Sequence, residues 1–253
     1  MIKKILITVF IVLLSLFLLC IFVLYNFPYD SVISRIDTSL RNAYSVNLSV
    51  SNVRYRFPFK LVFEDVRLIG EGIPTTISTR VITLRPGLIG ENVVVTGQGL
   101  RMNSEEIEVK GGSFTISSKL KLMRLRNEIS PDAIESLNVK IDSAKMERVH
   151  LSGFEFSSFT IATALLSFKK GDENLRIEQG FVKSDLFTSE ISGFYGSREV
   201  DILVTLKLTD RFFERYENLT GLVESLTDNE AIRFSIKGNT KRPTLNIESR
   251  PGI

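Results

Sequence analysis

Twenty uncharged residues near the N-terminus constrain this chain more than any other feature. Ile5–Leu24 contains only Leu, Ile, Val and Phe, apart from Thr8, Ser15 and Cys20. A helix rises about 1.5 Å per residue, so this stretch would span about 30 Å, the hydrocarbon thickness of a bilayer. The sequence therefore predicts a transmembrane helix over residues 5–24.

The charges beside this stretch predict its orientation. Lys3 and Lys4 precede it directly, and the next basic residue is Arg35. Because cytoplasmic flanks carry the excess of Lys and Arg, we expect residues 1–4 in the cytoplasm and the rest of the chain outside it. The predicted flanks of the anchor are the two lysines and three interfacial aromatic residues, namely Lys3, Lys4, Tyr25, Phe27 and Tyr29.

Two other uses of this stretch are a cleaved signal peptide and a lipoprotein anchored through Cys20. The apolar run exceeds the usual 7–15 residues of a signal peptide, and no small-x-small cleavage site follows it. Leu18 and Leu19 are bulky for the positions before a lipoprotein cysteine. An uncleaved anchor with Cys20 as a buried thiol is the favoured interpretation.

Composition limits the function of the exported part. Once the two N-terminal lysines are set aside, 30 basic residues face 29 acidic ones. This balance gives no reason to expect nucleic acid as a partner, and no stretch of sequence is basic enough to indicate phosphate binding. The only cysteine lies in the anchor, so no intramolecular disulfide forms, but the exported part is long enough to bury a core without one.

Residues 25–45 are predicted to form a juxtamembrane linker and a short amphipathic helix. Apolar residues recur at helical spacing across Val32–Ala43, and Asp30 or Ser31 is a candidate cap. Pro28 predicts a bend after the membrane helix. This helix either lies near the membrane or docks on a sheet as an ordinary helix.

From residue 46 the hydrophobic period changes from 3.6 to 2, which indicates strands. We predict a β-rich domain over 46–248 and a disordered tail over 249–253. A brief helical interval is expected over 130–137, a second helix over Phe212–Leu226, and a closing hairpin at Ala231–Glu248. The predicted fold class is mainly β: an N-terminal transmembrane helix followed by an elongated, curled antiparallel β-sheet with two short flanking helices.

A weak internal similarity relates residues 46–125 to residues 137–208. Phe63–Leu68 reads like Met146–Leu151, and each segment is followed two residues later by a glycine. Short alternating patterns also match by chance, so the sequence leaves two alternatives open, namely duplicated β units that stack on one another and a coincidence.

Alternation predicts one apolar face along the sheet, because successive side chains of a strand point to opposite sides. A sheet with few helices to cover it must curl on itself, pack against a partner or hold lipid. The main candidates for an apolar groove are Phe63, Val66, Leu68, Phe114, Ile116, Val149, Leu151 and Phe156. Further candidates for the same face are Val93, Val95, Ile161, Leu203 and Leu206.

Catalytic patterns are absent from the sequence. His150 is the only histidine, and the exported part has no cysteine, so a His/Cys metal site and a Cys–His pair are excluded there. Adjacent acids such as Glu64-Asp65 and Glu105-Glu106 point to opposite faces of a strand and make poor acid–base pairs. We therefore expect no enzyme, no cofactor and no metal site.

Three segments carry a resemblance to a known family. They are the anchor followed by Phe27-Pro28-Tyr29-Asp30, the segment Val46–Leu68 with its Phe-Pro turn, and the ending Phe234–Leu245, in which Gly238 and Pro243 lie between two apolar strands. In this order they resemble the type II secretion system protein N family and, more loosely, AsmA-like membrane-anchored proteins. The middle of the chain, 69–225, matches only in its strand texture.

The resemblance implies a single-pass protein of the bacterial inner membrane with a periplasmic C-terminal domain. As a protein N relative it would be an accessory or scaffold component of an envelope secretion machine. As an AsmA-like relative it would bind or transfer lipid through an apolar β groove. The implied partners are the bilayer, other envelope or secretion-machine proteins, and phospholipid.

Overall fold

The computed structural model describes Ser15 and residues 28–56, 60–70, 75–87, 92–120, 134–151, 154–171, 174–196, 199–221, 223, 231–240 and 242–248. Apart from Ser15, the predicted anchor 5–24 lies outside these residues, as do Lys3, Lys4, Tyr25, Phe27 and the tail 249–253. Within the described part of the chain, no helix combines the length and the apolar character needed to cross a bilayer.

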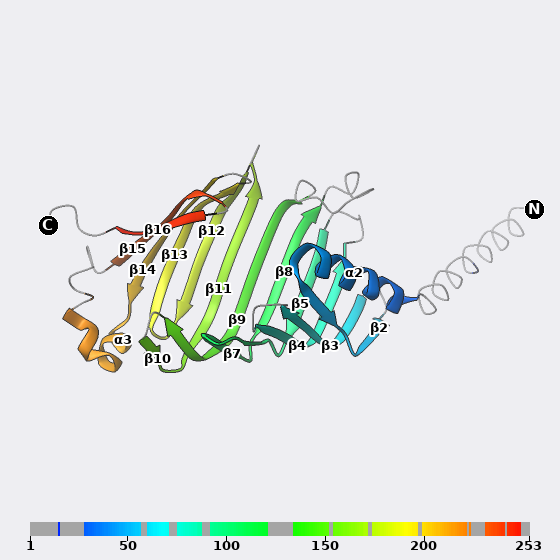
Figure 1. Cartoon of the computed structure of the whole chain (residues 1–253), viewed down its shortest axis with the longest axis horizontal. Helices are drawn as coiled ribbons and strands as arrows, with labels where there is room; N and C mark the ends of the chain where they lie inside the picture. Colours follow the sequence, from blue (N-terminus) through cyan, green and yellow to red (C-terminus); the bar gives the residue numbers. More distant parts are fainter. Residues whose placement is uncertain are drawn as a thin grey trace, which may run out of the picture.

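The described strands form one 16-stranded sheet, and all of its pairings are antiparallel. The main path runs β1-β3-β4-β5-β8-β9-β11-β12-β13-β14-β15-β16 and follows the long axis of the molecule (Figure 1). The prediction of a mainly β, antiparallel fold with few helices is confirmed. Both halves of the weak repeat lie in this one sheet, and the duplication itself stays a prediction.

The strand bounds are β1 Val46–Ser49, β2 Asn52–Arg56, β3 Lys60–Gly70, β4 Thr76–Pro86, β5 Asn92–Gln98, β6 Arg101–Asn103, β7 Ile107–Lys110, β8 Ser113–Leu120, β9 Ile134–Leu151, β10 Phe154–Phe156, β11 Phe159–Lys170, β12 Asn174–Ser184, β13 Phe187–Gly196, β14 Glu199–Leu208, β15 Ala231–Asn239 and β16 Arg242–Glu248. The helices with described bounds are α2 Tyr29–Tyr44, α3 Asp210–Arg215 and the 3₁₀ turn η3 Glu217–Leu219, and Thr220, Gly221 and Val223 are also helical.

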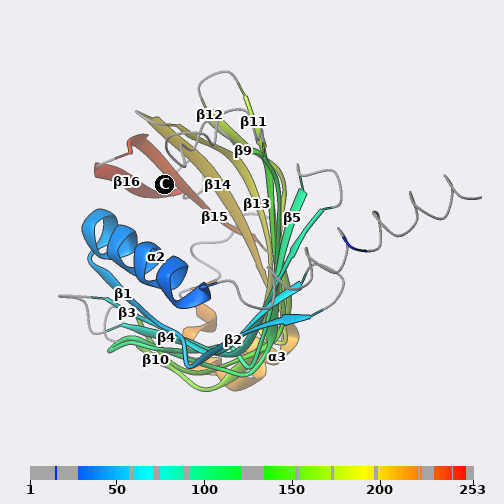
Figure 2. The same ribbon diagram turned by 90° about the vertical axis from the view of Figure 1, so that its right-hand side faces the viewer.

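The sheet is strongly curved, and its long strands bend between two arms (Figure 2). In β3 and β9 a non-glycine residue has a positive φ, 49° at Asp65 and 56° at Ser143. The flanking register places Asp65 opposite Arg80 and Ser143 opposite Ala162, and all four residues are exposed. Irregular residues of this kind bend a strand and increase its twist.

We call the two sides of this bend the long arm and the short arm. The long arm contains β2, β5, β8, β12–β16 and residues 60–64, 81–86, 134–142 and 163–170. The short arm contains β1, β6, β7, β10 and residues 66–70, 76–79, 144–151 and 159–161. Strand β4 therefore pairs with β5 in the long arm and with β6 in the short arm.

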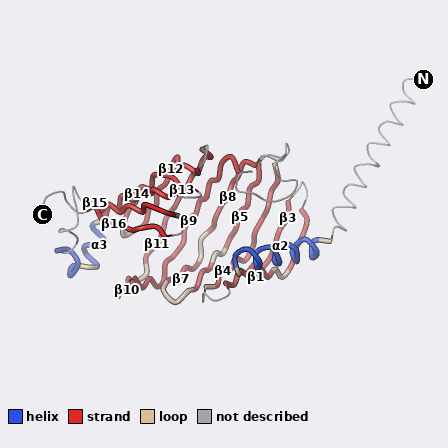
Figure 3. Tube along the Cα trace, turned by 45° about the horizontal axis from the view of Figure 1, so that its top comes forward, coloured by secondary structure: helices blue, strands red, loops and turns tan. Residues whose placement is uncertain are grey.

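Helix α2 lies on the concave side of the sheet, over its β1–β3 end (Figures 2 and 3). The backbone N–H of Leu48 donates to Oδ1 of Asp37 at 2.7 Å, so the helix satisfies a group on the edge of β1. The helix confirms the prediction for this segment, although it starts at Tyr29 after an N-terminal Pro28, and neither Asp30 nor Ser31 is its cap.

Two predictions of helix need correction. The second helix is not continuous over Phe212–Leu226: α3 ends at Arg215, Tyr216 has non-helical φ −129° and ψ 52°, and helical residues return after η3 at Thr220, Gly221 and Val223. The Tyr216 hydroxyl binds Ser157, which fixes this turn against the sheet. The helical interval at 130–137 is wrong from Ile134 onwards, where β9 begins and pairs with β8 and β11. The closing hairpin β15–β16 is confirmed.

Candidate functional site

One face of the long arm carries apolar side chains across successive strands. Directly opposite residues of neighbouring strands share a face, so the register identifies its members. Phe63 lies opposite Ile82, Leu84 opposite Val95, and Val95 opposite Ile116. Continued through the register, the set is Leu61, Phe63, Ile82, Leu84, Val93, Val95, Phe114, Ile116, Val139, Ile141, Ala164, Leu166, Val182, Ile191, Ile202, Val204, Phe234 and Ile236.

All of these side chains are half-buried. They are therefore neither sealed in a core nor fully exposed. The opposite face of the same strands is more polar, and includes Thr96, Thr115, Ser117, Lys119, Asn138, Lys140, Thr163, Ser167, Thr188, Ser192, Thr205, Lys207, Arg233 and Lys237. It also carries the apolar residues Val62, Val81, Val94, Leu165, Phe181 and Leu203. The long arm thus has one predominantly apolar face and one mixed face that carries the charged residues.

A second apolar row crosses the short arm. Leu48, Leu68 and Ile77 follow one another in register. The row continues through Met102, Val109, Met146, Val149, Phe156 and Phe159. Val66 in the same row is 6% exposed, whereas Arg67 and Ile69, which point the other way, are exposed. Because α2 covers this end of the sheet from the concave side, the better-buried row is the concave one.

The apolar row keeps to one side of the sheet because the alternation shifts at the bend. In β3 it steps three residues, from Phe63 to Val66, past the polar pair Glu64-Asp65. In β9 it makes the same step, from Ile141 to Ala144. A regular strand would have placed Asp65 and Arg67 on the apolar side. We call the combined row of both arms the apolar face.

Most of the predicted groove residues lie on this face. Phe63, Phe114 and Ile116, with Val93, Val95 and Leu206, are on the long arm. Val66, Leu68, Val149 and Phe156, with Ile161, are on the short arm. Leu151 ends β9 opposite Phe154. Leu203 was placed wrongly, because it lies opposite Ser192 and Ser235 on the polar face.

Sequence reasoning missed about two-thirds of the long-arm face. Val139, Ile141 and Leu166 belong to it, as do Ile82, Leu84, Val204 and Phe234. Their alternation is visible in the sequence, for example in Val139 and Ile141. Only the register between strands reveals that these residues join the same row as Phe114.

Gly97 and Phe114 show how closely this face is packed at one point. The two residues lie opposite each other in β5 and β8. A Cβ atom at Gly97 would come within 2.1 Å of the Phe114 ring. The ring therefore lies over the backbone of β5, and the missing side chain of Gly97 makes room for it.

The far end of the sheet is closed by α3 and a compact apolar cluster. Its buried members are Val149, Phe159, Leu186, Phe212, Val223 and Ile232. Leu186 is 2% exposed, and the Phe212 ring lies 5.1 Å from that of Tyr216. This cluster includes Val149 and Phe159 from the short arm, so the apolar face ends against packed side chains.

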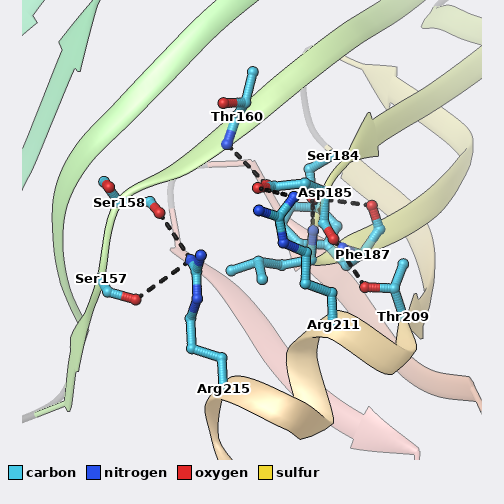
Figure 4. A network of polar contacts seen from close by, with 10 residues as sticks. Ser157, Ser158, Thr160, Ser184, Asp185, Phe187, Thr209, Arg211 and Arg215 are labelled. Atoms are coloured by element: carbon cyan, nitrogen blue, oxygen red, sulfur yellow. Dashed lines mark hydrogen bonds and ion pairs between the residues drawn. The ribbon is translucent and has the colours of Figure 1, made fainter.

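Polar contacts hold α3 in this position (Figure 4). Asp185 accepts a hydrogen bond from the Thr160 backbone N–H at 2.8 Å, and its carboxylate lies 3.3 Å from Arg211 of α3. Arg215 donates to the Ser158 carbonyl at 2.9 Å. The helix is therefore fixed to the β12–β13 turn and to the start of β11.

The structure offers no arrangement typical of catalysis in the part of the chain that it describes. No group of three or more His, Cys, Asp or Glu side chains there could hold a metal ion. His150 is half-buried in β9, and its backbone N–H donates to the Glu106 carbonyl at 2.7 Å. The apolar face is the most extensive candidate site of the described residues.

Comparison with known proteins adds no assignment. No family model, no curated protein and no solved structure matches this chain.

Proposed function

We propose that this protein holds the acyl chains of lipids along its apolar face. The observation that supports this proposal is a half-buried apolar row that continues in register from β3 to β15, backed by a more polar face. A contiguous apolar patch of this extent is unusual on the surface of a soluble domain unless it binds a partner or a ligand. Acyl chains fit a long, mainly aliphatic and aromatic surface with few directional polar groups, here Ser118 and Ser189.

In the same proposal, Ile5–Leu24 anchors the chain in a bacterial inner membrane with the sheet in the periplasm. The bilayer then supplies the lipid, and α2 follows the anchor along the chain. This is the role that the resemblance to AsmA-like proteins implies, and it involves no catalysis.

Photo-crosslinking in cells tests the lipid proposal. A photoreactive amino acid in place of Ile116, on the apolar face, is expected to crosslink to phospholipid. The same residue in place of Ser117, the next position of β8 on the polar face, serves as the matched control. Mass spectrometry of the purified full chain would detect the adduct. Equal lipid labelling at both positions, or none at Ile116, would contradict the proposal.

A second candidate function is the scaffold of an envelope secretion machine, as the resemblance to protein N implies. It is favoured by β16, whose residues 242–246 are all exposed and which, among the described strands, pairs with β15 alone. Leu245 on this edge is 64% exposed. An edge of this kind can accept a strand from another protein. Crosslinks from Leu245 to an envelope protein, without lipid adducts at Ile116, would support the scaffold.

A further inference from the structure

A second site lies on the other side of the sheet, at the bend. A hollow of about 380 Å³ is lined by residues of β3, β4, β6 and β7, with Gly99 and Gly111 at its rim. This volume is within the range of pockets that hold small ligands. Its lining is strongly basic, with Arg67, Arg80, Arg101 and Lys110 against the single acid Asp65.

The register explains how these cations gather. Arg67 lies opposite Ser78, Ser78 opposite Arg101, and Arg101 opposite Lys110. Lys110 in turn lies opposite Lys145 of β9. Like charges that face each other directly across strands are destabilising, so this row needs compensating negative charge.

Internal acids compensate only the lysine end of the row. Lys110 pairs with Glu108 at 3.0 Å and also with Glu147, and Lys145 lies 3.4 Å from Glu147. Arg67, Arg80 and Arg101 form no ion pair or hydrogen bond through their side chains with any of the described residues. Among the described residues, three arginines that form no ion pair therefore line the hollow, together with one carboxylate, Asp65.

The backbone at the bend makes room for one of these groups. Gly99 has φ +71°, and a Cβ atom there would come within 3.2 Å of Arg80 Cβ and 3.7 Å of its Nε. The Arg80 side chain therefore crosses the chain where Gly99 leaves the surface open. Gly111, with φ +76°, has open space where its Cβ would be. Both positions keep bulk out of the hollow.

We propose that this hollow binds a phosphate group. Guanidinium groups are always charged, and their planar fork matches phosphate oxygens in a bidentate manner. Three arginines in the lining of one hollow provide the donors for a tetrahedral oxyanion with more than one charge. The group belongs either to a lipid headgroup or to a free phosphorylated compound, and the recognition chemistry is the same for both.

The cluster explains why no phosphate site is visible in the sequence. Arg67, Arg80 and Arg101 belong to three strands and are far apart along the chain. The local density of basic residues is ordinary around each of them. Only the folding of β3, β4 and β6 side by side brings them together.

Calorimetric titration of the full chain in detergent tests this proposal. The probes are inorganic pyrophosphate and dihexanoyl phosphatidylglycerol, a soluble short-chain lipid. We expect saturable binding that weakens by about tenfold or more in Arg80→Gln and in Arg101→Gln, as expected for the loss of a charge-assisted contact. Arg176→Gln is the matched control, because Arg176 is exposed on β12, away from these strands.

Each outcome has a defined meaning. If the lipid binds and pyrophosphate does not, the site recognises a lipid headgroup. If pyrophosphate binds, either alone or in competition with the lipid, the site recognises the phosphate group without the rest of the lipid. Arg101→Lys keeps the charge but loses the fork, so it should bind more weakly than the wild type and more tightly than Arg101→Gln. Circular dichroism confirms that the variants are folded.

The proposal is overturned if neither probe binds, or if Arg176→Gln weakens binding as much as the hollow variants do. The site is independent of the apolar face, so Phe114→Glu should leave pyrophosphate binding unchanged. Loss of lipid crosslinking together with intact pyrophosphate binding would therefore separate the two functions.

Discussion

At the scale of single residues, Gly97 shows how strictly the apolar face limits side-chain volume. The Phe114 ring occupies the space that a Cβ would need. We predict that Gly97→Ala displaces this ring and destabilises the protein by about 1–3 kcal/mol, as overpacking does. Thermal unfolding of the full chain in detergent measures this effect. Gly221→Ala is the control, since no atom lies within 4 Å of its Cβ position, and an unchanged Gly97→Ala variant would contradict the packing.

Glu147 predicts a pH dependence. Its hydrogen bond from Lys110, followed by the Coulombic effect of that lysine, lowers the pKa of Glu147 below its ordinary 4.5. The hydrogen bond from Glu147, and then that from Glu108, raises the pKa of Lys110 above its ordinary 10.5. Because its pKa is lowered in the folded protein, ionised Glu147 stabilises the fold at pH values above its ordinary pKa of 4.5. This stabilisation is lost as the pH falls through the pKa of the folded protein. Because its pKa is raised, charged Lys110 stabilises the fold fully below pH 10.5, and this stabilisation is lost as the pH rises through the raised pKa.

Glu147→Gln should therefore unfold at lower urea concentration than the wild type at pH 7, and the difference should shrink as the pH falls below 4.5. Urea titrations at several pH values measure this difference. Glu199→Gln, at an exposed position of β14, provides the comparison. A difference that stayed constant between pH 7 and pH 3 would show that the carboxylate of Glu147 has no such role.

At the scale of elements, the stability of α3 depends more on its contacts with the β12–β13 turn than on interactions within its own six residues. Leu186 in that turn is 2% exposed and packs in the cluster with Phe212. Leu186→Ala is predicted to cost about 2–5 kcal/mol, the range for large-to-small changes in a core. Chemical denaturation measures the loss, and hydrogen exchange should increase most at α3. Leu245→Ala, at a residue 64% exposed, should stay within about 0.5 kcal/mol of the wild type.

The sequence predicted most elements because their periodicity is local. The strand texture from residue 46, the helix after Pro28 and the closing hairpin all follow from spacing and turn residues. The second helix is interrupted at Tyr216, whose hydroxyl binds Ser157, some sixty residues earlier in the chain, and local spacing contains no sign of this contact. Ile134 and Leu137 fit a helical pattern, but pairing with β8 and β11 outweighs that preference.

At the scale of the whole molecule, the bend decides which residues share a face. Leu203 was misplaced because alternation alone does not fix the register between strands. Phe63 and Val66 were both placed correctly, although regular alternation would have separated them. The arginines of the hollow could not be found from the sequence, since their convergence depends on β3, β4 and β6 lying side by side.

Ser143 provides a test of the bend. Its φ of 56° is accessible to glycine without cost, whereas a β-branched residue is strained there. Ser143→Val should destabilise the protein by about 1–3 kcal/mol, and Ser143→Gly should change little. Thermal unfolding and small-angle X-ray scattering measure the stability and the shape. Equal stability of the two variants would show that this backbone conformation is not required.

The strands lie across the long axis, so the length of the apolar face depends on how many strands there are. Twelve strands in the main path, about 4.8 Å apart, give about 50 Å, which exceeds the hydrocarbon thickness of a bilayer. Each added hairpin would lengthen the surface by about 10 Å without altering its cross-section. The length of the apolar face and its cross-section can therefore vary independently in this fold. A chain with more strands would have a longer apolar face that accepts the same kind of ligand.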